Sequence, residues 1–146
     1  SCASERRRQS KAETCAGRVF CVDTWSGDEG TGLLSARESL KLYVEFLDNA
    51  KMAGVLHKIA PLTMRSDLAS ERFEHIDLLY IDGAHEYESV LIDLTAWAHL
   101  VAGAICGDDY DYPDVHRAVN NYVADNPIWS VRAEHGGRMF IMERVK

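Results

Sequence analysis

The sequence has no long hydrophobic run, no paired cysteine motif and no excess of positive charge. No apolar stretch in its 146 residues approaches the roughly 20 residues that cross a bilayer, and the N-terminus has no apolar signal core. The four cysteines form no CxxC pair and show no Cys/His spacing typical of zinc sites, which favours a reducing, cytoplasmic setting. A net charge of −7 argues against nucleic acid as a partner. We therefore expect neither a membrane nor a nucleic-acid interface.

What the chain does contain is enough apolar sequence for one domain. Hydrophobic residues make up 47% of it, which suffices for a sizeable core at this length. Residues 1–17 are polar and aperiodic, with the only basic run of the chain, and we expect them to form an N-terminal arm. The domain is then expected over residues 18–146.

Short apolar runs alternate with amphipathic stretches along this domain. The pattern predicts strands at 19–22, 55–60, 77–81 and 104–107, helices at 34–52, 66–73, 86–101 and 113–124, and a C-terminal hairpin that turns at Gly136-Gly137. Pro61 is expected to close the strand before it, and Gly103 to end the third helix. Strands that alternate with helices in this way indicate an α/β fold, in which a mostly parallel sheet has helices on both faces.

Aspartates follow three of the predicted strands directly. Asp23 follows the first strand, Asp82 the third, and Asp108 with Asp109 the fourth. The carboxyl ends of parallel strands share one rim, where such sheets bind ligands, and neighbouring strands are only about 4.8 Å apart. Each aspartate alone is equally well explained as a helix cap. Asp82, Asp108 and Asp109 together would repel one another unless a cation or shared protons intervened, and Mg²⁺ is the simplest candidate.

Two segments carry a resemblance to a known family. "VFCVDTWSGD" and "LLYIDGAHEYESVLIDLTAWAHLVAGAICGDDYDYPDVHRAVNNYV" resemble the class I S-adenosylmethionine-dependent methyltransferases of the macrocin O-methyltransferase type. That group includes metal-dependent sugar and macrolide O-methyltransferases. The resemblance covers about residues 18–143, and its most specific part is the D-G-x-H…G-D-D-Y combination. It implies a Rossmann-like fold and transfer of a methyl group from S-adenosylmethionine to a hydroxyl of a small molecule.

The resemblance also implies roles for individual residues. Carried over position by position, it makes His85 the general base. Asp23 would bind the ribose of the cofactor, and Ser66 and Asp67 would lie near its adenine. Asp82, Asp108 and Asp109 would bind Mg²⁺ or a similar cation. In that chemistry the metal lowers the pKa of the substrate hydroxyl and the histidine removes its proton.

The sequence departs from this family before Arg18. The family's first strand and glycine-rich turn should lie there, but the preceding 17 residues contain no apolar strand and no G-x-G. A strand, turn and crossover helix need roughly 25 to 30 residues. We therefore expect a truncated domain with poor cofactor affinity. Val19–Val22 is expected to pair directly with Asp77–Ile81, or with a second chain in a homo-oligomer.

Two other functions remain open from the sequence. The missing glycine turn favours a non-catalytic remnant that serves as an oligomeric or ligand-binding α/β module, whereas the retained acids and His85 favour an enzyme. A different metal-dependent enzyme, such as a hydrolase, is disfavoured because the sequence has no nucleophile elbow.

Overall fold

The computed structural model describes residues 17–27 and 32–145, so the predicted N-terminal arm lies almost wholly outside the described residues. The chain divides into two compact units, Ser1–Arg65 and Ser66–Lys146, and each is described by itself. In the described parts, no helix is long and apolar enough to cross a membrane.

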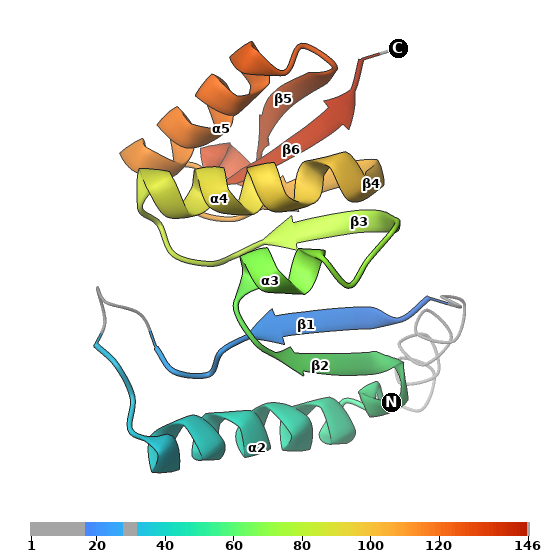
Figure 1. The fold of residues 1–146 in the computed structure, drawn as a ribbon, viewed down its shortest axis with the longest axis vertical. Helices are drawn as coiled ribbons and strands as arrows, with labels where there is room; N and C mark the ends of the chain where they lie inside the picture. The colour runs from blue at the N-terminus through green and yellow to red at the C-terminus, as the bar shows by residue number, and fades with distance from the viewer. Residues whose placement is uncertain (1–16, 28–31, 146) are drawn as a thin grey trace, which may run out of the picture. The chain divides into compact units, whose positions relative to one another are not determined.

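The first unit is a strand pair with one long helix. Strand β1 (Val19–Asp23) and strand β2 (Ile59–Thr63) pair in parallel, and helix α2 (Ala36–Met52) with the short 3₁₀ helix η1 (Leu56–Lys58) connects them (Figure 1). This is a strand–helix–strand unit, as the alternating pattern predicted.

Helix α2 begins where the sequence predicted. The Ser35 hydroxyl accepts a hydrogen bond from the Glu38 backbone N–H, and the Glu38 carboxylate accepts one from the Ser35 N–H at 2.9 Å. This reciprocal capping box satisfies two backbone donors at the helix start. The helix packs on the loop after β1, where the Trp25 ring contacts the rings of Tyr43 and Phe46 at centroid distances of 5.5 and 5.0 Å.

Strand β1 pairs with β2 in this unit. Pairing of Val19–Val22 with Asp77–Ile81 or with a second chain stays a prediction, because the two units are described separately. Another prediction for this unit is wrong. Pro61 does not close a strand but lies inside β2, opposite Cys21. Proline has no N–H to donate, and it is tolerated there because β2 has a paired neighbour on one side only in the described sheet.

The second unit is a four-stranded sheet with helices. Its elements are α3 (Ser66–Ser70), β3 (Ile76–Ile81), α4 (Tyr87–Trp97), η2 (Ala98–Leu100), β4 (Val101–Gly107), α5 (Pro113–Asp125), β5 (Trp129–Glu134), η3 (His135–Gly137) and β6 (Met139–Arg144). The strand order is β3-β4-β6-β5, in which β3 and β4 are parallel and the other pairs antiparallel (Figure 1). The α/β fold and the C-terminal hairpin are confirmed.

The core of this unit lies between helices α4 and α5 and one face of the sheet. Its largest fully buried side chains are Phe140, Leu94, Ile105, Met142, Val101 and Val119. The opposite face of β3 carries Leu78 and Tyr80, which are 62% and 50% exposed. Alternation along the strand places these two side chains away from the core.

The prediction that Gly103 ends a helix is also wrong. Helix α4 ends at Trp97, and Gly103 lies inside strand β4. A Cβ at this position would meet the backbone oxygen of Asp77 at 2.3 Å, beside the register shift between Ile76 and Leu78. Glycine is therefore required here for the close approach of two strands and not for a helix cap.

Candidate active site

The candidate site is built at the carboxyl ends of β3 and β4. Ile81 and Gly107 are register partners, so Asp82 and Asp108 follow the ends of two adjacent parallel strands. The Asp108 N–H donates to the Ile81 carbonyl at 3.2 Å and continues the pairing by one residue. The predicted convergence of these two acidic segments is confirmed.

The shortest side-chain contact at this rim joins His85 and Asp109. His85 Nε2 lies 2.6 Å from Asp109 Oδ2, and the two side chains are 49% and 22% exposed. An ionised carboxylate can only accept a hydrogen bond, so Nε2 carries the proton. In the neutral imidazole the lone pair is then on Nδ1, and that nitrogen is free to take a proton.

The loop that carries Asp109 is held by its own hydrogen bonds. Asp109 has a positive φ of 56°, a conformation that aspartate tolerates better than most residues. Its N–H donates to Asp108 Oδ1 at 3.0 Å, and its carbonyl accepts from the Tyr112 N–H at 2.9 Å. The Tyr112 ring stacks on His85, with 5.0 Å between centroids and 22° between planes. The imidazole is thus fixed by a hydrogen bond and by a ring.

The three predicted metal ligands are not arranged as one cluster. Within residues 17–27 and 32–145, no three His, Cys, Asp or Glu side chains are placed to hold a metal ion together. The Asp109 carboxylate is directed to His85 instead. The donors have the chemistry that Mg²⁺ requires, but their geometry does not fit it, and we derive no catalytic step through a metal.

The predicted cofactor residues lie in both units. Asp23 is exposed and accepts a hydrogen bond from the Trp25 N–H at 2.7 Å. Ser66 and Asp67 begin helix α3, and the Ser66 hydroxyl accepts from Trp97 Nε1 at 2.8 Å. Because the two units are described separately, a shared cofactor site for Asp23 and the others stays a prediction.

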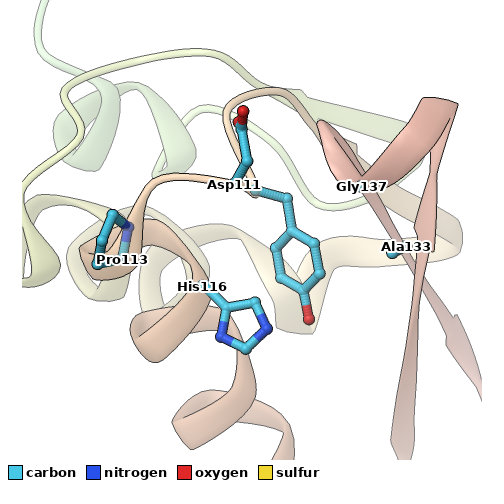
Figure 2. Close-up of a pocket in the computed structure, with 6 residues that line it drawn as sticks. Asp111, Pro113, His116, Ala133 and Gly137 are labelled. Carbon is cyan, nitrogen blue, oxygen red and sulfur yellow. The ribbon is translucent and has the colours of Figure 1, made fainter.

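A pocket of about 440 Å³ opens beyond the same loop. It is lined by Tyr110, Asp111, Pro113, His116, Ala133 and Gly137, from the loop after β4, the start of α5 and the hairpin (Figure 2). The Tyr110 and His116 rings lie 4.7 Å apart, and the Tyr110 hydroxyl accepts from Asn120 Nδ2 at 2.9 Å. This pocket was not predicted from the sequence. The "GDDYDYP" motif supplies one side of the pocket. Nothing in the sequence indicated that Ala133 and Gly137 of the hairpin would form the other side.

Comparison with solved structures gives the same fold. NovP, an O-methyltransferase, is 20% identical with a TM-score of 0.68, and the match covers 92% of this chain and 62% of NovP. Cofactor-bound Rv0187 from MTB is 13% identical, with a TM-score of 0.62 and 90% and 63% coverage. The O-methyltransferase from Bacillus cereus in complex with SAH is 17% identical, with a TM-score of 0.56 and 100% and 82% coverage. This chain thus spans less than two thirds of the length of NovP and of Rv0187.

The family comparison covers most of the chain. No curated protein matches the sequence. A family model described as "Methyltransferase domain" matches residues 2–110, which include strands β1 to β4 and the His85–Asp109 pair. The chain therefore belongs to the methyltransferase domain family, whose members use S-adenosylmethionine, and it has the α/β fold of the class I enzymes.

Proposed function

We propose that this protein transfers a methyl group from S-adenosylmethionine to a hydroxyl of a small molecule, with His85 as the general base. The observation that carries the proposal is the 2.6 Å contact between His85 Nε2 and Asp109 Oδ2. It leaves Nδ1 unprotonated in the neutral ring and fixes the direction of its lone pair. A general base must lie within hydrogen-bond distance of the group from which it takes a proton. In this proposal, Asp109 contributes by orienting the His85 ring so that Nδ1 faces the acceptor hydroxyl.

The reaction then needs little covalent chemistry from the protein. His85 Nδ1 takes the proton of the acceptor hydroxyl as its oxygen attacks the sulfonium methyl. The C–S bond breaks, and its electron pair stays on the sulfur of S-adenosylhomocysteine. Asp109 stabilises the imidazolium that forms, and Tyr112 keeps the ring in place. Most of the acceleration in such a transfer comes from positioning the two reactants.

Metal dependence stays a prediction. Asp82, Asp108 and Asp109 supply oxygens of the kind that Mg²⁺ binds, but among the described residues they are not arranged as one metal site.

Calorimetric titration with S-adenosylmethionine and S-adenosylhomocysteine, with and without Mg²⁺, tests the proposed function. We expect weak binding of both, in the high micromolar range, because the described residues include no glycine-rich turn of the kind that receives the methionine part. No heat with either compound would contradict the proposal. Mg²⁺ binding that survives the double change Asp82→Asn, Asp109→Asn would remove these residues as its ligands.

The pocket in Figure 2 is our proposed place for the body of the acceptor. It offers an aromatic ring, a carboxylate and an imidazole, which together suit a hydroxylated ring. Asp111→Asn and His116→Ala should each raise KM for the acceptor by about tenfold and change kcat less, because they remove binding contacts. The measurement is steady-state kinetics at saturating cofactor. An unchanged KM in both variants would place the acceptor elsewhere.

The alternative function is a non-catalytic module that associates through its sheet. The exposed Leu78 and Tyr80 on β3 favour it, because large apolar side chains on an open strand face invite a partner. A homo-oligomer is our proposal for that partner. Absence of cofactor binding in the titration above, together with self-association in light scattering, would favour this function.

A further inference from the structure

One amide side chain on helix α5 contacts two residues that line the pocket in Figure 2. Asn120 Nδ2 donates to the Tyr110 hydroxyl at 2.9 Å and to the His116 backbone carbonyl at 2.7 Å. The same nitrogen lies 3.3 Å from His116 Nδ1. Tyr110 and His116 are both lining residues of the pocket. Asn120 can therefore act on the pocket through these two rings.

The direction of these hydrogen bonds follows from the backbone carbonyl. A carbonyl oxygen can only accept, so the Asn120 atom that lies 2.7 Å from it has to be the amide nitrogen. An amide nitrogen can only donate, so the Tyr110 hydroxyl oxygen and His116 Nδ1 are both acceptors. The NH₂ group has two protons for three acceptors, so one proton is shared. The orientation of the Asn120 amide is thus determined by the fold of α5.

Both rings then keep a proton for a molecule in the pocket. A hydroxyl that accepts a hydrogen bond still has its own proton to donate, and Tyr110 is otherwise buried, at 7% exposed. A neutral imidazole whose Nδ1 accepts carries its proton on Nε2. The two rings lie 4.7 Å apart, so the two donors belong to one part of the pocket.

We propose that Asn120 is a positioning residue that makes donors of the Tyr110 hydroxyl and His116 Nε2. The pocket then selects a methyl acceptor that presents a hydrogen-bond-accepting oxygen, of a hydroxyl, ether or carbonyl group, to these two rings. The inference rests on the proposed function, which puts the body of the methyl acceptor in this pocket. A molecule that presents only donors there would leave polar groups unpaired and bind more weakly.

The tautomer of His116 tests the role of Asn120 without any methyl transfer. At about pH 9, where histidine side chains are generally neutral, ¹⁵N NMR should find the wild-type proton on Nε2. Asn120→Asp replaces the donor with an oxygen that only accepts, so the proton should move to Nδ1 in most molecules. Asn120→Ala removes the donor altogether, and the Nδ1–H form should become detectable beside the Nε2–H form. This second variant covers the case in which Asn120→Asp does not fold.

Asn121→Asp is the matched control for this measurement. It makes the same chemical change one position later, where the amide donates to the Tyr87 hydroxyl at 3.0 Å. It should leave the His116 tautomer as in wild type. A wild-type proton on Nδ1 would overturn the proposal, and so would a tautomer that neither Asn120 variant changes.

Steady-state kinetics shows whether the two rings carry the effect on specificity. With a panel of small hydroxylated rings that includes catechol and methyl glucoside, Asn120→Ala should raise KM about fivefold and leave kcat nearly unchanged, as for one lost hydrogen bond. In a Tyr110→Phe, His116→Ala background the same change should have no further effect, because no donor remains to be oriented. An equal rise in both backgrounds would overturn the proposal. If no member of the panel is methylated, the proposed function fails, while the His116 tautomer still decides the role of Asn120.

Discussion

His85→Ala should lower kcat by about 10²-fold or more, the usual contribution of a positioned general base. The change removes the imidazole that Asp109 orients and on which Tyr112 stacks. The measurement is the formation of S-adenosylhomocysteine with a panel of small hydroxylated acceptors. Cofactor affinity should change little, because His85 acts on the acceptor.

Two further variants make this result specific. Asp109→Ala should lower kcat by less than His85→Ala, because the imidazole remains but is no longer oriented. His99→Ala removes an exposed histidine of the same unit, in η2, and should leave kcat unchanged. If His85→Ala turns over at a near-normal rate, His85 is not the base. If Asp109→Ala matches wild type, the 2.6 Å contact has no role in catalysis.

Phe140→Ala should destabilise the second unit by about 3–5 kcal/mol, the range for truncating a buried phenylalanine. Phe140 is 1% exposed and lies in the centre of the core, beside Tyr110 at 5.7 Å between ring centroids. It also packs against Gly107, where an added Cβ would meet the Phe140 ring at 2.5 Å. The cavity would therefore form directly under the strand end that carries Asp108 and Asp109.

Urea denaturation followed by circular dichroism measures this loss. Leu78→Ala removes a comparable apolar side chain that is 62% exposed, and it should change the free energy of unfolding by less than about 0.5 kcal/mol. Equal destabilisation by both changes would mean that the face of β3 carrying Leu78 is covered in solution. A loss below about 1 kcal/mol for Phe140→Ala would contradict the core described above.

The sequence by itself determined the local elements, because their signals are local. The Ser35–Glu38 capping box, the apolar stripe of α5 and the Gly136-Gly137 turn each act over a few residues, and each lies where it was predicted. Alternation of strands and helices was enough to fix the parallel pairing of β3 and β4. That pairing brings the acidic segments together, so the rim was also predictable from the sequence.

Only the tertiary structure decided what glycine, proline and aspartate do at particular positions. Gly103 looked like a helix cap, but it is a strand residue required by the backbone oxygen of Asp77, which is distant in sequence. The sequence placed Asp109 among the metal ligands, whereas its contact with His85 spans 24 positions and follows from loop geometry after two different strands. Such roles depend on distances between segments that chain topology brings together, and a sequence pattern carries no distances.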